Sequence, residues 1–153
     1  MAPAEPLGRV ISVNGSQAII RLRPPGGSWT PDARVTVGKF LGIRTGQGLV
    51  IGVLTKISTD AADAQQGGHA TGQLDLLGEI RTDGRNGAYF DRGVKEYPTI
   101  GDAADLIAHR DLRLVFDVSG SDTINIGHLQ QDEAIGAYVK VDDLVRKHFA
   151  VFG

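Results

Sequence analysis

The stretch GRVISVNGSQAIIRL, residues 8–22, decides the fold class of this chain. Two runs rich in β-branched residues, 9–13 and 17–22, flank Asn14-Gly15, and an Asn-Gly pair readily adopts the positive φ angles that a tight hairpin needs. Successive side chains of a strand point to opposite faces. Three apolar residues of the second run therefore share one face: Ala18, Ile20 and Leu22. The stretch predicts an antiparallel hairpin with one buried face.

A second hairpin is predicted from residues 39–44 and 49–57, joined by the turn Thr45–Gly48. Gly52, inside the second of these strands, indicates a bulge or a tight bend of the kind that small barrels need at their corners. The next segment, 58–71, is polar and rich in small residues, and it has no periodicity. It predicts a mobile excursion between strands.

Residues 72–80 return to a period of two and predict a half-buried strand. The buried face of this strand is expected to carry Leu74, Leu76 and Ile80. The solvent face is expected to carry Gln73, Asp75, Glu79 and Arg81. A turn at 82–87 then leads the chain back into residues 88–98.

The last third of the chain mixes short helices and strands. Residues 103–108 are apolar, and their pattern leaves strand and helix open. A helix of one or two turns is predicted at 109–116, and another at 142–147, which Asp142 or Asp143 can N-cap by accepting from exposed backbone amides. Strands are predicted at 122–129, with Ile124, Ile126 and His128 on one face, at 137–141, and at 148–152.

Length and composition favour one domain that is rich in turns. The chain has 153 residues, 41% of them hydrophobic, and 21 glycines without a low-complexity tract, which indicates turns between many short strands. The runs amount to roughly eight to ten strands at the spacing of a barrel or sandwich. We predict a mainly β fold, a small antiparallel β-barrel with one or two short helices. Residues 1–141 are assigned to the barrel, and residues 142–153 to a linker helix and a final strand.

Charge and cysteine content exclude several classes of protein. The 16 basic and 18 acidic residues give a formal net charge of -2, which argues against a dedicated phosphate-binding surface. Without cysteine, the chain has no disulfide and no thiolate metal site. The opening MAPAEPLG lacks the pattern of a signal peptide, and the longest nearly apolar run, 49–54, is far shorter than the ~20 residues that span a bilayer. We expect a soluble, cytoplasmic protein with no membrane partner.

Titratable residues form no catalytic or metal-binding pattern. Four histidines lie in unlike elements without ligand spacing: His69, His109, His128 and His148. Four carboxylates near predicted turns are explained by capping or solvation: Asp102, Asp105, Asp132 and Glu133. No catalytic residue and no metal ligand is therefore predicted. A small hydrolase would require His109, Asp111 and His128 to converge in a deep pocket.

Basic residues keep one alternative function open. Arg92 and Lys95 flank Phe90 and Tyr97, and exposed aromatics among basic residues suit stacking on single-stranded nucleic acid. The cluster 146–148 could meet phosphate, although cations at a helix C-terminus are also favoured by the helix dipole. The alternative is a stand-alone nucleic-acid-binding barrel of the OB or SH3-like type. Its candidate contacts are Arg92, Lys95, Arg146 and Lys147.

Three stretches carry a resemblance to a known family. Residues 8–22 resemble the opening hairpin of the barrel shared by HerA-like DNA-translocating ATPases and F-type ATP synthase subunits. The shared G-x-V-x-x-V-x-G pattern falls on Gly8, Val10, Val13 and Gly15. The tail INIGHLQQDEAIGAYVKVDDLVRKHFAVFG, residues 124–153, is similar to the segment that joins this barrel to the HerA-like motor, and YPTIGD, residues 97–102, extends the resemblance. In that family, the strand matching 148–152 runs directly into the Walker A loop.

The resemblance implies the amino-terminal barrel of a HerA-like protein, followed by the first strand of a RecA-like ATPase core that is missing here. Gly153 is then the first residue of an incomplete Walker A loop, and ATP and Mg²⁺ are expected only for the full-length parent. This chain alone should therefore not be an enzyme. The family further implies a hexameric ring whose motor moves double-stranded DNA. In such a ring, the barrel supports subunit contacts and docks a nuclease or other effector protein.

Overall fold

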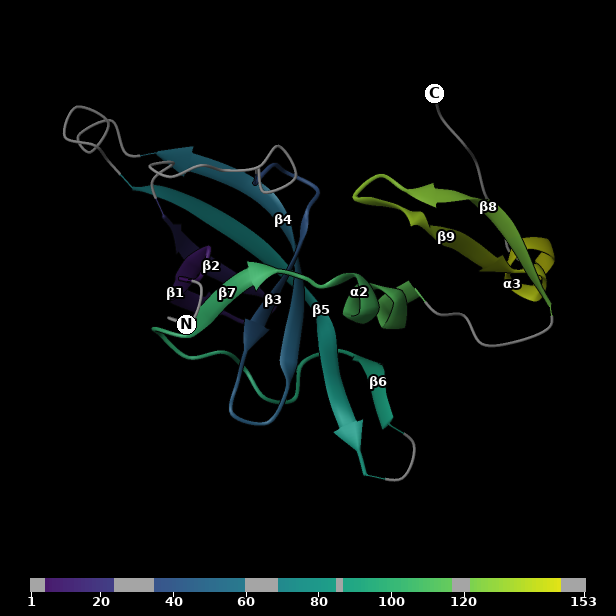
Figure 1. Ribbon diagram of the computed structural model, residues 1–153, viewed down its shortest axis with the longest axis horizontal. Coiled ribbons are helices and arrows are strands. Elements are labelled where there is room, and N and C mark those ends of the chain that lie inside the picture. Colours follow the sequence, from purple (N-terminus) through teal and green to yellow (C-terminus); the bar gives the residue numbers. More distant parts are fainter. Residues whose placement is uncertain (1–4, 24–34, 60–68, 85–86, 117–121, 147–153) are drawn as a thin grey trace. The chain divides into compact units, whose positions relative to one another are not determined.

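The computed structural model describes residues 5–23, 35–59, 69–84, 87–116 and 122–146 (Figure 1). Its contacts divide the chain into two compact units, residues 1–108 and residues 109–153. The predicted strand 148–152, Lys147 and Gly153 lie outside the described residues. Within the described part of the chain, no helix combines the length and the apolar character needed to cross a membrane.

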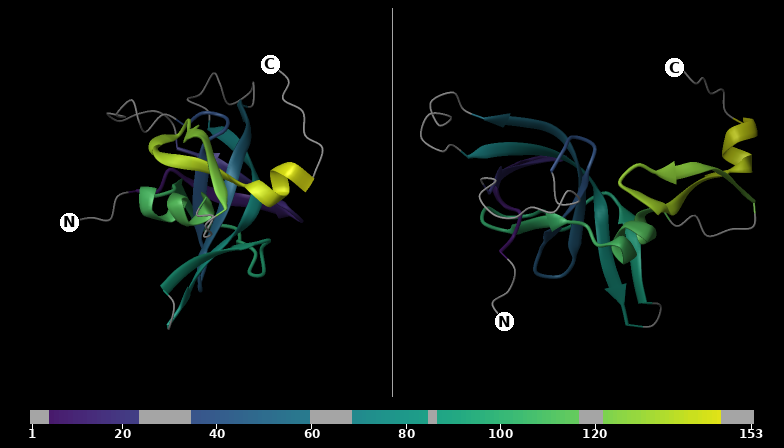
Figure 2. Two further views of the ribbon diagram at one scale, coloured as in Figure 1. Left: turned by 90° about the vertical axis from the view of Figure 1, so that its right-hand side faces the viewer. Right: turned by 45° about the horizontal axis from the view of Figure 1, so that its top comes forward.

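The first unit is a closed antiparallel barrel (Figures 1 and 2). Its strands are β1 (Gly8–Asn14), β2 (Gln17–Leu22), β3 (Phe40–Arg44), β4 (Leu49–Thr59), β5 (Ala70–Asp83), β6 (Gly87–Arg92) and β7 (Ala103–Leu106). They follow the order β2-β1-β7-β3-β4-β5-β6, and a further pairing of β2 with β5 closes the first six into a barrel. β6 pairs with the end of β5 outside this closure. The predicted mainly β fold and small antiparallel barrel are confirmed, and residues 103–106 form a strand.

The first hairpin is confirmed, with its turn one residue later than predicted. Asn14 pairs with Gln17, so the loop is Gly15-Ser16. Gly15 has φ +53°, while no described residue other than glycine has a positive φ. A two-residue loop with glycine at the first central position is the type II′ arrangement, whose twist suits a hairpin. The predicted face is also confirmed, since Ala18, Ile20 and Leu22 are all buried.

A bulge in β1 decides which of its side chains enter the core. The register of the hairpin shifts between Val10 and Ser12, so Ile11 has no partner on β2. A regular ladder continued from Asn14–Gln17 would place Arg9 opposite the buried Leu22, on the core face. The bulge instead places Val10 on that face, opposite Ile20, and turns Arg9 outward. The extra residue thereby spares the barrel a buried guanidinium, which would be costly without a partner.

The barrel core is aliphatic and comes from every strand of the closure. Its fully buried members are Val10, Ala18, Ile20, Leu41, Ile43, Val50, Leu54, Leu74 and Ala104. The pairing of β4 with β5 shifts between Ile51 and Gly52, where a bulge or a tight bend was predicted, but the extra residue lies on β5 and not in the strand that contains Gly52. Ile51 pairs with Gly78 and Gly52 pairs with Leu76, so Leu77 is the extra residue on β5.

This second bulge overturns the predicted faces of β5. After Leu77 the side chains of β5 alternate with their two faces exchanged. Glu79 therefore lies opposite the core residue Val50. Glu79 is 3% exposed, whereas the sequence placed it on the solvent face. Ile80, expected beside Leu74, is buried outside the main core cluster. The prediction holds for Leu74 and Leu76, which lie before the bulge. It was wrong for Glu79, because one extra residue reverses every following side chain.

The predicted excursion 58–71 is shorter than expected at both ends. β4 continues to Thr59 and β5 starts at Ala70, and Ser58 pairs with Thr71 in the ladder. The hydroxyls of Ser58 and Thr71 are also hydrogen-bonded to each other at 3.1 Å. Pairing and hydroxyl contacts extend the strands into sequence that lacks an alternating pattern. Residues 60–68 of the excursion lie outside the described chain.

The second unit contains α2 (His109–Phe116), β8 (Thr123–Leu129), β9 (Asp132–Lys140) and α3 (Val141–Arg146). β8 and β9 pair only with each other within the described chain, as a two-stranded antiparallel sheet. The helix at 109–116 is confirmed. α3 begins at Val141, so Asp142 and Asp143 lie in its first turn and the predicted N-cap was wrong. Carboxylates in a first turn still favour the helix through its dipole.

The two compact units divide at a different place from the sequence assignment. The sequence placed a boundary after residue 141, whereas the units divide between Ala108 and His109. α2, β8 and β9 therefore belong with α3, because their contacts are mainly with one another. Strand alternation at 122–129 and 137–141 looks the same as in the barrel, so the local pattern carries no sign of this division.

Candidate functional site

Two of the predicted phosphate contacts, Arg92 and Lys95, lie at the end of β6 and just beyond it. The Lys95 ammonium donates a 2.6 Å hydrogen bond to the Asp91 carboxylate, four residues earlier. This hydrogen bond and the attraction of the opposite charges lower the pKa of Asp91 and raise the pKa of Lys95. A carboxylate thus already balances the charge of Lys95, whereas Arg92 is exposed.

The aromatic pair of this region is split between packing and solvent. Phe90 is half-buried, and its ring covers the backbone of β5, since a Cβ added to Gly78 would lie 2.7 Å from Phe90 Cζ. Tyr97 is 50% exposed. Of the two aromatics, only Tyr97 is therefore available for stacking on a base.

The remaining two predicted contacts lie beyond the barrel. Arg146 is the last residue of α3 and is exposed, while Lys147 lies outside the described residues. Arg146 belongs to the second unit and Arg92 and Lys95 to the first. The structure thus brings only Arg92 and Lys95 together on one unit. The nucleic-acid-binding alternative stays a prediction.

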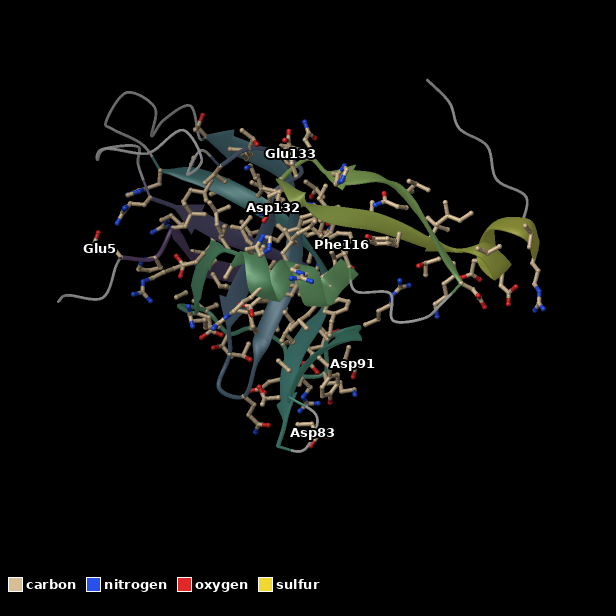
Figure 3. All side chains as sticks on the ribbon, turned by 45° about the vertical axis from the view of Figure 1, so that its right-hand side comes forward. Glu5, Asp83, Asp91, Phe116, Asp132 and Glu133 are labelled. Atoms are coloured by element: carbon tan, nitrogen blue, oxygen red, sulfur yellow. The ribbon has the colours of Figure 1, made fainter. Side chains whose placement is uncertain are left out.

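Among the described residues of the second unit, the side chain of His109 contacts that of Asp132, which Figure 3 labels. Nδ1 of His109, at the start of α2, is hydrogen-bonded to Oδ2 of Asp132, at the start of β9. The other oxygen of Asp132 accepts from the backbone amide of Ala134 at 3.1 Å. The hydrogen bond from His109 is the main cause that lowers the pKa of Asp132. The contact joins the helix to the hairpin.

Two carboxylates singled out by the sequence bond to backbone amides in the barrel. Asp102 accepts from the amide of Thr99 at 2.7 Å, within the turn that precedes β7. Asp105 accepts from the amide of Leu7 at 2.9 Å. The Asp102 contact confirms the capping interpretation. Asp105 lies within β7 and bonds to an amide 98 residues away in the sequence, so it caps no local turn. Across the described ranges, no three or more His, Cys, Asp or Glu residues are grouped so that they could hold a metal ion.

The second unit has a cavity of about 420 Å³ bordered by Arg113, Phe116 and Tyr138. His109, Asp111 and His128 do not line it, and His109 is bonded to Asp132 instead. The convergence that a hydrolase would require is therefore not found at this cavity.

The first unit has a groove of about 470 Å³ that the sequence did not reveal. We call it the arginine groove. Its basic side chains are Arg9 on β1, Arg21 and Arg23 on and after β2, and His69 before β5. Its apolar side chains include Ile11, the bulged residue of β1, and Ile100, which is 76% exposed.

The arginines of this groove differ in how they are held. Arg9 Nη1 donates to the backbone oxygen of Gly101 at 2.8 Å, and Arg23 Nη1 forms a 2.6 Å ion pair with Glu5, which Figure 3 labels. Arg21 has no hydrogen-bond or ion-pair partner for its side chain among the described residues. It lies directly opposite Arg9 in the ladder, where like charges are unfavourable.

Comparison with known proteins adds no family and no relative to these observations. No protein-family model matches the chain, and no curated protein matches it. The features that bear on function are therefore the barrel, its opening hairpin and the arginine groove.

Proposed function

We propose that this chain is the amino-terminal barrel of a HerA-like DNA-translocating ATPase, where it supports ring assembly and docks an effector protein. The observation that carries the proposal is the closed six-stranded antiparallel barrel that opens with the hairpin of residues 8–22. In this proposal the barrel is not catalytic by itself. ATP, Mg²⁺ and double-stranded DNA belong to the parent motor.

Each position of the hairpin pattern has a structural role in such a barrel. A Cβ on Gly8 would lie 2.7 Å from the backbone oxygen of Arg21, so only glycine fits where the two strands approach. Gly15 supplies the positive φ of the turn. Val10 is 1% exposed, and Val13 packs against the core cluster. The pattern therefore supports a barrel start of the kind found in this family.

Barrel closure also bears on how the domain would dock a partner. β1 pairs with β2 and β7, and β2 pairs with β1 and β5, so neither strand offers a free edge. A partner on this side would have to bind side chains of the outer face, because neither of these strands has an edge to extend. The proposed docking is therefore through surface residues.

The first test is to read the parent gene beyond the codon for Gly153. The proposal expects the next codons to complete x-Thr-Gly-x-Gly-Lys-Ser or a close variant, since these residues cradle phosphate and bind Mg²⁺. A stop codon directly after Gly153 would contradict the proposal.

A second test compares this chain with the full-length product in an ATPase assay and in native mass spectrometry. We expect DNA-stimulated hydrolysis and a hexamer from the full-length protein, and no hydrolysis above a blank from residues 1–153. Turnover by residues 1–153 that survives further purification would contradict a non-catalytic barrel.

A further inference from the structure

We propose that the arginine groove is a docking site for an acidic segment of a partner protein that carries an aliphatic anchor side chain. The inference rests on the docking role proposed above and adds the place and the chemistry of the contact. It depends on a pair of opposed arginines, an exposed isoleucine held in place, and a lining without phenylalanine, tyrosine or tryptophan among the described residues of the groove.

The opposed arginines provide the charge for such a contact. Arg9 and Arg21 are direct cross-strand partners and both are exposed, so they stand side by side on the outer face of the barrel. Directly opposed like charges lower stability in a sheet, and Arg21 has no partner within the described chain to offset this. A carboxylate between the two guanidiniums would accept charge-assisted hydrogen bonds and remove the repulsion.

Backbone hydrogen bonds hold the apolar part of the groove in place. The turn that contains Ile100 is fixed to β1 by the amide of Gly101, which donates to Val10 at 2.8 Å, and by the amide of Val10, which donates to Asp102 at 2.9 Å. The Arg9 guanidinium adds its bond to Gly101. Ile100 is 76% exposed, so a large aliphatic side chain is presented to solvent on a fixed backbone. A preorganised contact of this kind costs little ordering entropy when a partner binds.

The lining favours an acidic peptide over a nucleic acid. None of the described residues that border the groove is phenylalanine, tyrosine or tryptophan, so the groove lacks the large aromatic platforms on which bases stack best. The Glu5 carboxylate already neutralises Arg23, which leaves fewer unpaired cations among the described residues of the groove for the successive phosphates of a nucleic acid. Aliphatic side chains beside two arginines match a segment in which acidic residues flank a leucine or isoleucine.

The test is fluorescence anisotropy of residues 1–153 with a short fluorescein-labelled peptide in which glutamates and aspartates flank two leucines, at low ionic strength. We expect Arg21→Gln to weaken binding about tenfold, the effect of losing one charge-assisted contact. Ile100→Ser, and a peptide with serine in place of leucine, should each weaken binding as well. Arg44→Gln, at the exposed end of β3 and outside the groove, is the matched control and should leave binding unchanged.

Three outcomes would overturn the inference. The first is no binding at millimolar protein, and the second is equal weakening by Arg21→Gln and Arg44→Gln. The third is tighter, Arg21-dependent binding of a labelled single-stranded DNA, which would make the groove a nucleic-acid site.

The thermal midpoint of Arg21→Gln should be unchanged or higher than that of the wild type, so lost binding cannot be attributed to unfolding. Ile100→Ser, in an exposed turn, tests the groove if Arg21→Gln does not fold. Because the peptide assay does not depend on any residue beyond Gly153, its failure is distinguishable from the failure of the proposed function.

Discussion

The chain contains two hairpins with similar alternating sequences and very different surroundings. β1 and β2 lie in a closed sheet, where β1 also pairs with β7 and β2 also pairs with β5. The core-facing side chains of β2, Ala18, Ile20 and Leu22, are at most 6% exposed. β8 and β9 pair only with each other among the described strands, and Ile124 and Ile126 are 45% and 63% exposed. An alternating pattern thus predicts a strand and, as far as the next bulge, the residues that share a face. On β8 the register shifts between Asn125 and Gly127, so the prediction that His128 shares a face with Ile124 was wrong. Whether a face is covered depends on the strands and helices that come to lie against it.

Truncating one isoleucine in each hairpin gives the largest expected contrast. Ile20→Ala removes a fully buried side chain from the barrel core and should lower the free energy of unfolding by about 2–5 kcal/mol. Ile126→Ala, at a position 63% exposed on β8, should change it by about 0.5 kcal/mol or less. Urea denaturation followed by circular dichroism measures both. A loss at Ile126 similar to that at Ile20 would show that the open hairpin face is covered in solution.

The close approach of β1 and β2 should be the next most sensitive feature. Gly8→Ala would place a methyl group 2.7 Å from the backbone oxygen of Arg21, and the strands would have to separate at a cost of about 1–3 kcal/mol. The control is Gly46→Ala in the β3–β4 turn, where the nearest atom to an added Cβ is Glu96 Oε1 at 3.5 Å. Thermal unfolding should show a loss for Gly8→Ala and little change for the control. Equal effects would mean that the approach is looser than the structure shows.

The opposed arginines should produce a smaller change, of the opposite sign. Arg21→Gln removes like-charge repulsion from the barrel hairpin and should raise the free energy of unfolding by about 0.2–1 kcal/mol. In an Arg9→Gln background the same substitution should have almost no effect, because the repulsion is already absent. A double-mutant cycle by urea denaturation at low salt measures this coupling. A coupling energy of zero would show that the two side chains do not interact.

The smallest expected effect is a pH dependence in the second unit. The pKa of Asp132 lies below its usual value of 3.8 in the folded protein, chiefly because of the hydrogen bond with His109. A lowered carboxyl pKa means that its stabilising contribution is present above the unfolded pKa and is lost as the pH falls through the folded one. Asp132→Asn should therefore unfold with a shallower loss of stability in acid than the wild type, measured from the thermal midpoint across acidic pH. The matched control is Glu133→Gln, next to Asp132 and exposed. If the thermal midpoint falls with pH equally in Asp132→Asn and in the wild type, the assignment of this contribution to Asp132 is contradicted.

Several features of the fold are set by short stretches of sequence. The run 17–22 predicts which side chains of β2 are buried, because alternation is a local property of any extended strand. Residues 109–116 predict a helix for similarly local reasons. The capping role of Asp102 is also local, since short carboxylates near turns often bond to backbone amides.

The arginine groove could not be predicted in the same way. In a regular hairpin that turns at Gly15-Ser16, Arg9 would lie opposite Leu22 on the core side. The sequence of residues 8–14 does not predict that Ile11 is an extra, unpaired residue. The bulge brings Val10 opposite Ile20, and both side chains are then buried in the barrel core. Only the resulting register brings Arg9 beside Arg21 and places the turn at Ile100 next to both.

The amino-acid sequence by itself determined that this protein is mainly β, where most of its strands lie and which side chains of β2 share a face, because these properties depend on neighbours only a few residues apart. The tertiary structure decided that six strands close into a barrel, that Glu79 is buried rather than exposed, that 109–146 belongs to a second unit, and that two arginines meet on the outer face. Each of these depends on which distant strands pair and on bulges that one strand imposes on another, and a short stretch of sequence does not contain that information.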